Sequence, residues 1–169
     1  NVALVENGEV LNIEGFKQWR TDFADAEFIL ENNKYICGWA VEKMSKSKYN
    51  VVNPDDVIAK YGTDCFRMYE MFLGPLTDAK PWSTEGIEGV SRFLRKFWRL
   101  FKFDNGVPVL SEAPPTADEL KVLHKTIKKV NEDIERLSFN TAVSAFMECV
   151  NDLNTLKCAN RQVLQQLTA

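Results

Sequence analysis

Residues 116–137, TADELKVLHKTIKKVNEDIERL, decide the fold class of this chain. Thr116 and Glu119 form a capping box, in which each side chain satisfies a free backbone N–H at the start of a helix. Apolar residues then recur at alternating intervals of three and four, which is the spacing of one helix face. They are Leu120, Leu123, Ile127, Val130, Ile134 and Leu137. We predict a helix that packs through this apolar seam in an antiparallel bundle.

The same periodicity continues on both sides of this helix. Upstream, a helix over about 85–103 is predicted by Ile87, Val90, Leu94, Phe97, Trp98 and Phe101. Downstream, Asn140 is expected to cap a helix with the inner face Val143, Phe146, Val150 and Leu153. Residues 161–168 begin another helix. Two short helices are predicted at 53–61 and 64–73, because each follows a capping residue and ends at or before a glycine.

Residues 1–40 carry weaker and mixed signals. Short apolar runs at Val2–Val5 and Phe28–Leu30 indicate strands, and Tyr35–Trp39 is a candidate return strand after a turn at 31–34. Ile13–Trp19 is predicted to form one or two helical turns. The predicted fold class is therefore mainly α: a small α+β N-terminal piece, a short helical connector and an incomplete antiparallel helix bundle.

Composition excludes several classes of protein. The chain has 169 residues, 45% of them hydrophobic and 27% charged, which is typical of a soluble globular protein. No apolar stretch approaches the roughly 20 residues of a membrane span, and no signal peptide opens the sequence. The four cysteines lack C-x-x-C spacing and the chain has one histidine, so we expect no bound metal. We expect a monomeric protein with free thiols in the reducing cytoplasm.

Net charge does not by itself indicate a nucleic-acid partner. The chain carries −3, and residues 1–36 hold seven acidic against three basic side chains, hence −4. The remainder is close to neutral, so any contact with nucleic acid depends on local basic patches.

The segment Lys43-Met44-Ser45-Lys46-Ser47 carries a specific chemistry. Ammonium groups on a short loop can stabilise the charge that develops on pyrophosphate as it leaves ATP. We assign the main pyrophosphate contact to Lys46 and the second to Lys43. Ser45 and Ser47 supply hydroxyl or backbone N–H donors, and Met44 is expected to anchor the loop by packing. The alternative is a solvated lysine–serine loop without a catalytic role.

The sequence around this loop resembles a known family. Residues 42–56, EKMSKSKYNVVNPDD, are similar to the signature loop and following segment of the leucyl-, isoleucyl- and valyl-tRNA synthetases of class I. The segments MFLGP at 71–75 and GIEGVSRFL at 86–94 resemble the bacterial leucyl-tRNA synthetases in particular. The resemblance is good over about 35–103 and weaker through 169.

The resemblance implies a leucine–tRNA ligase, which converts leucine and ATP to leucyl-adenylate and then leucyl-tRNA. The implied partners are ATP with Mg²⁺, leucine and tRNA(Leu). By this resemblance, residues 1–40 would be the end of an insertion or leucine-specific-type module, and 41–52 the KMSKS loop. Residues 53–83 would be a stem-contact-type connector, and 84–169 part of an anticodon-binding-type bundle. The H-x-G-H-type element of the family cannot be present, because His124 is the only histidine. This segment alone is therefore expected to be inactive.

Basic residues on the helix predicted over 85–103 are candidate tRNA contacts. They recur three or four apart at Arg92, Arg95, Lys96 and Arg99. Such side chains can bind phosphates, which gives affinity without reading sequence; an ordinary solvated helix face is the alternative. We assign the lysines at 121, 125, 128 and 129 to solvation. Phe97, Trp98 and Phe101 are expected to pack in the core rather than to stack on bases.

Two other identities remain open at this point. The segment could come from an isoleucyl- or valyl-tRNA synthetase, which share the loop and the segment that follows it. It could also be a stand-alone helical RNA-binding module that retains the loop as a relic. The amino-acid preference of the intact enzyme would distinguish the first case.

Overall fold

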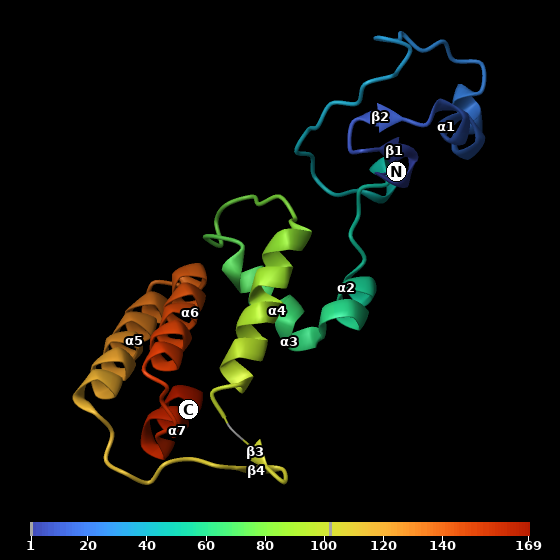
Figure 1. The fold of residues 1–169 in the computed structure, drawn as a ribbon. Coiled ribbons are helices and arrows are strands. Elements are labelled where there is room, and N and C mark those ends of the chain that lie inside the picture. Colours follow the sequence, from blue (N-terminus) through green and yellow to red (C-terminus); the bar gives the residue numbers. More distant parts are fainter. Residues whose placement is uncertain (1, 102) are drawn as a thin grey trace. The chain divides into compact units, whose positions relative to one another are not determined.

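The computed structural model describes residues 2–101 and 103–169. The chain divides into two compact units, residues 1–53 and 54–169 (Figure 1). The first unit holds the loop of interest, and the second holds the helices. The fold is mainly α, as the periodicity predicts.

The first unit contains short elements joined by irregular backbone. They are the 3-10 helices η1 (Val2–Leu4), η2 (Thr21–Phe23) and η3 (Lys46–Lys48), the strands β1 (Val5–Glu6) and β2 (Val10–Leu11), and the helix α1 (Ile13–Trp19). The two strands form an antiparallel hairpin. Its turn is Asn7-Gly8, with φ of 51° and 75°, the left-handed geometry that Asn-Gly adopts readily.

Aromatic rings hold the first unit together. The Phe16 ring on α1 lies 5.8 Å from Phe23 and 6.0 Å from Phe28, and Phe28 lies 5.3 Å from Tyr35. The predictions of a helix at Ile13–Trp19 and of a turn at 31–34 are confirmed. The predicted strand at Phe28–Leu30 is wrong. Ring packing of Phe28, rather than a backbone ladder, fixes that run.

The predicted strand at Val2–Val5 is wrong over Val2–Leu4, which form η1. The candidate return strand Tyr35–Trp39 is reduced to an isolated bridge of Ile36 with Val10.

The second unit is built from helices and one small hairpin. Its elements are α2 (Pro54–Tyr61), α3 (Thr63–Phe72), α4 (Thr84–Trp98), β3 (Phe103–Asp104), β4 (Val107–Pro108), α5 (Ala117–Glu135), α6 (Phe139–Thr155) and α7 (Arg161–Thr168). Every helix predicted after residue 53 forms. α4 ends earlier than predicted, because Asn105-Gly106 makes the turn of the β3–β4 hairpin. Ser138, not Asn140, is the N-cap of α6.

The main core of the second unit lies where α5, α6 and α7 meet. Its buried members are Leu100, Leu123, Cys149, Val150, Leu153, Cys158, Val163, Leu164 and Leu167. The most extensive helix contact is that of α5 with α6, and α3 packs on both α4 and α6. The predicted inner face of α6 is confirmed by buried Val150 and Leu153 and by the half-buried Phe146.

The apolar seam predicted for α5 is only partly right. Leu123 and Val130 are buried, but Ile127 and Ile134 are 37% and 49% exposed. Thr126 and Asp133, each one position earlier, are buried in their place. Both polar groups have partners: Thr126 Oγ1 donates to the Val122 carbonyl, and Asp133 accepts from Lys129 Nζ at 2.6 Å.

The predicted end of that seam is also wrong. α5 ends at Glu135, and Leu137 adopts a left-handed φ of 57° beyond the helix. The Ser138 N–H donates back to the Asp133 carbonyl at 2.8 Å, which closes the helix end. Leu137 is 60% exposed and does not contribute to the packed face.

The predicted capping box at the start of α5 is confirmed. The Thr116 N–H donates to the Glu119 carboxylate at 2.8 Å, and the Glu119 N–H donates to Thr116 Oγ1 at 3.2 Å. A hydrogen bond from the Cys158 thiol, together with those from Thr116, holds the pKa of the buried Glu119 carboxyl below its ordinary value. Burial, with Glu119 as a neighbour, raises the pKa of the Cys158 thiol to about 11.

A close contact joins α3 to the start of α4. The Tyr69 ring is buried, and its hydroxyl donates to the Ser83 carbonyl at 2.7 Å and accepts from the Ser83 N–H at 3.1 Å. A Cβ atom at Gly86 would lie 2.7 Å from the Tyr69 ring and 2.8 Å from its hydroxyl. A Cβ atom at Gly89, one turn further on, would meet nothing within 4 Å.

This contrast gives a matched pair of substitutions. Gly86→Ala should destabilise the second unit by about 1–3 kcal/mol, because the new methyl group overlaps the fixed ring. Gly89→Ala should stabilise it by about 0.5–1 kcal/mol, because alanine favours an open helical position. Urea unfolding followed by far-UV circular dichroism measures both. Equal effects of the two substitutions would contradict the Tyr69 contact.

The Glu119 carboxylate gives a pH-dependent prediction. Because its pKa is lower in the folded chain than in the unfolded chain, its stabilisation is complete above the unfolded pKa. That stabilisation is lost as pH falls below about 4.3 and through the folded pKa. Glu119→Gln should therefore be less stable than the wild type by about 0.5–1 kcal/mol at neutral pH. The difference should shrink as pH falls below 4, measured as the free energy of unfolding; a difference that does not change with pH would refute it.

Candidate functional site: the lysine–serine loop and the basic face of α4

The lysine–serine loop is a folded turn. After Ser45 the chain forms η3, and Tyr49 ends it with a left-handed φ of 53°. The Ser45 N–H donates to Asn50 Oδ1 at 2.8 Å, and Asn50 Nδ2 donates to the Lys43 carbonyl at 3.4 Å. The hydroxyls of Ser45 and Ser47 lie 2.7 Å apart and share a hydrogen bond. The loop therefore has a defined backbone on an exposed surface.

The three lysines of the loop differ in their surroundings. Lys48 forms an ion pair with Glu42. Lys43 and Lys46 are exposed, and within residues 2–101 and 103–169 their ammonium groups make no ion pair or hydrogen bond. These two are the residues that sequence analysis selects for pyrophosphate. The arrangement leaves two cations available for an anionic ligand and neutralises the third.

Met44 does not have the expected structural role within this chain. Its side chain is 42% exposed, so the prediction that it anchors the loop by packing is not supported. An aromatic contact ties the loop to α1 instead: the Tyr49 ring lies 4.8 Å from the Trp19 ring, edge to face. The two residues are 30 positions apart, and the sequence contains no signal that pairs them.

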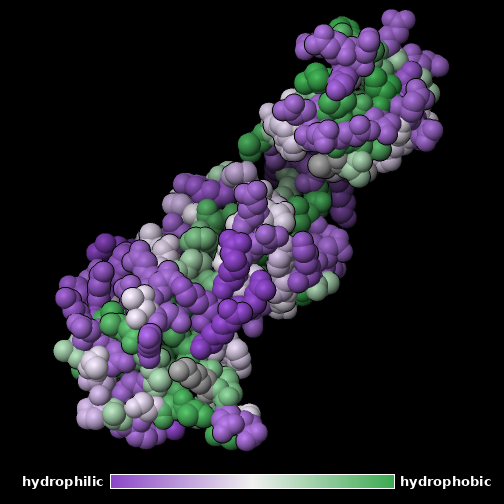
Figure 2. All heavy atoms as spheres, viewed as in Figure 1, coloured by the Kyte–Doolittle hydropathy of each residue, from purple (hydrophilic) through white to green (hydrophobic). Residues whose placement is uncertain are grey.

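The basic residues of α4 lie on an exposed face, and Figure 2 shows strongly hydrophilic residues gathered over this helix. Arg95 donates to the carbonyl and hydroxyl of Ser91, and Lys96 donates to Asn151 on α6. The side chains of Arg92 and Arg99 make no such contact among the described residues. They are seven positions apart, so they share one side of the helix, separated by about 10 Å.

The aromatic residues of α4 do not all enter the core. Phe97 and Phe101 pack against it, as predicted, with ring centroids 5.7 Å apart. Trp98 is 65% exposed and stacks on Phe103 of β3 at 5.4 Å, so its predicted core position is wrong. Successive helical residues point about 100° apart, so Phe97 and Trp98 cannot both face the same core.

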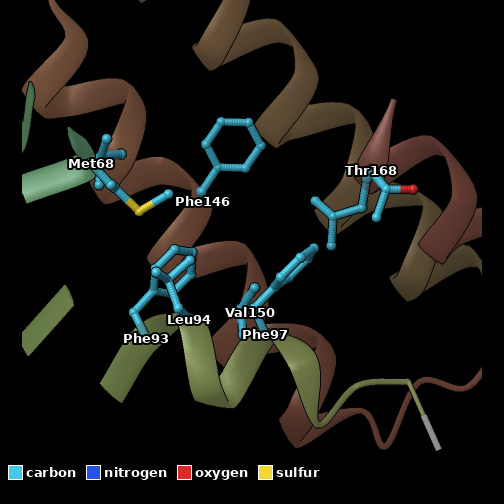
Figure 3. Close-up of a pocket in the computed structure, with 9 residues that line it drawn as sticks. Met68, Phe93, Leu94, Phe97, Phe146, Val150 and Thr168 are labelled. Atoms are coloured by element: carbon cyan, nitrogen blue, oxygen red, sulfur yellow. The ribbon is translucent and has the colours of Figure 1, made fainter. Parts of the chain in front are cut away.

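An apolar cavity of about 250 Å³ lies behind the basic face, between α3, α4, α6 and α7 (Figure 3). Its lining comprises Met68, Phe93, Leu94, Phe97, Val143, Phe146, Val150, Leu167 and Thr168. Thr168 is the polar residue of this set, and its hydroxyl donates to carbonyls of its own helix. The cavity offers no polar group to orient a substrate, so it does not add to the chemistry of the loop.

Three further properties of the described chain complete the picture. Across the described part of the chain, no group of three or more His, Cys, Asp or Glu side chains is placed to hold a metal ion. Over the same residues, no helix combines the length and hydrophobicity that a membrane crossing requires. All four cysteines are free; Cys65, Cys149 and Cys158 are buried and Cys37 is half-buried.

The sequence of this chain is similar to that of known tRNA ligases. The family described as "tRNA synthetases class I (I, L, M and V)" matches residues 35–83, and "Anticodon-binding domain of tRNA ligase" matches residues 119–167. A leucine–tRNA ligase of Cytophaga hutchinsonii is 65% identical over 168 residues, which are 99% of this chain and 18% of that protein. Over nearly its whole length the chain is homologous to leucine–tRNA ligases, and it corresponds to one segment of them.

Other members of the leucine–tRNA ligase family show the same extent of similarity. The enzyme of Bacteroides thetaiotaomicron is 59% identical over 99% of this chain and 18% of its own length. A LeuRS of Agrobacterium radiobacter, solved in a ternary complex with tRNA and LeuAMS, is 25% identical with a TM-score of 0.59. That match covers 74% of this chain and 18% of the solved chain. This chain thus spans about one fifth of the length of its relatives, and its lysine–serine loop lies within the family match at 35–83.

Proposed function

We propose that the enzyme containing this segment is a leucine–tRNA ligase that joins leucine to tRNA(Leu) at the expense of ATP. The proposal is carried by the exposed loop, in which Lys43 and Lys46 have no ion-pair partner among the described residues, in a chain 65% identical to a leucine–tRNA ligase. Leucine is favoured over isoleucine and valine because the similar proteins reported above are leucine enzymes. Nothing specific favours a stand-alone RNA-binding module.

The loop's role follows from the charge balance of activation. The leucine carboxylate attacks the α-phosphorus of ATP, the bond to the bridging oxygen of the β-phosphate breaks, and pyrophosphate leaves with the electron pair. Negative charge therefore grows on the pyrophosphate, and we assign its stabilisation to the ammonium groups of Lys46 and Lys43. Ser45 and Ser47 add donors. ATP enters as its Mg²⁺ complex, so the metal belongs to the substrate.

The remaining parts of the segment have assigned roles in this proposal. Residues 1–40 are the end of an insertion that precedes the loop at 41–52. Residues 53–83 are a connector of the stem-contact type, and 84–169 are part of the anticodon-binding bundle, in agreement with the family match at 119–167. We place the enzyme in the cytoplasm as a monomer.

The loop assignment is tested by leucine-dependent ATP–pyrophosphate exchange on the full-length enzyme. Lys46→Ala should lower the exchange rate by about 10²- to 10³-fold, because it removes a contact made to the leaving group. Lys48→Ala removes the same charge from a lysine already paired with Glu42, and should change the rate by less than about threefold. Exchange with isoleucine or valine in place of leucine, or equal losses in both variants, would contradict the assignment.

The α4 assignment is tested by the salt dependence of tRNA binding. Arg92→Ala and Arg99→Ala should each weaken binding by the full-length enzyme and reduce the slope of log K against log salt by about one. Lys128→Ala is the control, because it removes a basic side chain on α5 that pairs with Glu132. If the control flattens the slope as much as the α4 variants, general charge rather than this face binds tRNA.

A further inference from the structure

We propose that Asn50 is a positioning residue for the lysine–serine loop. The oxygen and the nitrogen of its side-chain amide both hydrogen-bond to the loop backbone and hold it in the conformation that activation requires; we call this pair of hydrogen bonds the Asn50 clip. The inference rests on the proposed role of Lys43 and Lys46 in leucine activation. Asn50 itself lies three residues beyond Ser47, the end of the lysine–serine segment, and we assign it no contact with the reacting atoms.

The amide of Asn50 uses its acceptor and its donor on two different residues. Its oxygen accepts from the Ser45 N–H at 2.8 Å, and its nitrogen donates to the Lys43 carbonyl at 3.4 Å. The backbone of Lys43 through Ser45 is therefore held against a single planar group. A carboxylate could only accept and a hydroxyl is too short to bridge both sites, so the side chain suited to this geometry is an amide.

The neighbouring Tyr49 turns the chain so that Asn50 can reach back. Its φ of 53° and ψ of 30° are left-handed, which is uncommon for a residue other than glycine, asparagine or aspartate. Its ring is fixed against Trp19 of α1 at 4.8 Å. The clip is therefore supported from α1. Trp19 of α1 contacts Tyr49, and the left-handed backbone at Tyr49 turns the chain so that Asn50 reaches the loop that carries Lys43 and Lys46.

The clip should affect the chemical step more than substrate binding. The two lysines act on charge that appears as pyrophosphate departs, so an error in their position raises the barrier and leaves bound leucine unaffected. Loss of the clip should therefore lower kcat for activation and leave the KM for leucine nearly unchanged. The affinity for tRNA should not change, because the basic face of α4 belongs to the second unit.

The test uses leucine-dependent ATP–pyrophosphate exchange on the full-length enzyme. Asn50→Ala should lower kcat about tenfold or more, with the KM for leucine within about twofold of the wild type. Asn50→Ser keeps a polar side chain that cannot bridge both groups, and should show the same loss of kcat. It serves as the second test if the alanine variant folds poorly. Glu42→Gln breaks the other contact across the loop, the exposed ion pair with Lys48, and should change kcat by less than about twofold.

A double-mutant cycle separates positioning from a general structural effect. If Asn50 acts through the loop, Asn50→Ala should lower kcat by a clearly smaller factor in the Lys46→Ala enzyme than in the wild type, because the Lys43 contact is then the one left to misplace. Fully additive losses, or unchanged kcat in both Asn50 variants, would overturn the inference while Lys46→Ala still reports on the proposed function. If Lys46→Ala itself retains full exchange, the proposed function of the loop fails, and the clip with it.

Discussion

The close packing of α5 on α6 is the constraint on which the second unit depends. On α6 the small residues Ala142, Ala145 and Cys149 are all buried, and Cys149 is a hydrogen-bonding neighbour of Thr126 on α5. On α5, Thr126 and Asp133 are buried, whereas the bulkier Ile127 and Ile134 are exposed. The buried carboxylate is tolerated because Lys129 and Thr141 lower the pKa of Asp133 through hydrogen bonds.

Local signals in the sequence predicted the helices well. Capping residues and apolar periodicity are properties of neighbouring positions, so the Thr116–Glu119 box and α7 could be inferred without any knowledge of tertiary packing. The rotation of α5 could not be inferred, because it depends on the side chains of α6. The Asn-Gly dipeptides at 7–8 and 105–106 are strong local signals of hairpin turns; Asn105-Gly106 marks the end of the helical pattern in the sequence, and the structure shows that it turns a hairpin. Trp98 shows the same limit as α5, since its stacking partner comes from a hairpin that the periodicity did not reveal.

The candidate site divides in a similar way. Lys43 and Lys46 could be selected from the sequence, because cations stabilise a departing pyrophosphate and the segment resembles the signature loop of class I synthetases. The sequence could not show that Lys48 is neutralised by Glu42, or that Asn50 spans the loop. On α4 it marked four basic residues as equals. The structure separates Arg95 and Lys96, which donate to Ser91 and Asn151, from Arg92 and Arg99, whose side chains make no such contact within residues 2–101 and 103–169. Pattern identifies the residue types that a reaction needs, and contacts decide which of them are free to act.

The distribution of thiols has a practical consequence for spectroscopy. Cys65, Cys149 and Cys158 are buried in the second unit, and burial raises the pKa of each thiol, which keeps them protonated and inert near neutral pH. Cys37 is half-buried in the first unit, the unit that also contains the lysine–serine loop. A maleimide fluorophore therefore has a preferred point of attachment in this segment without any engineering of cysteines. A dye at that position would report on the unit that holds the loop and leave the helical unit unlabelled.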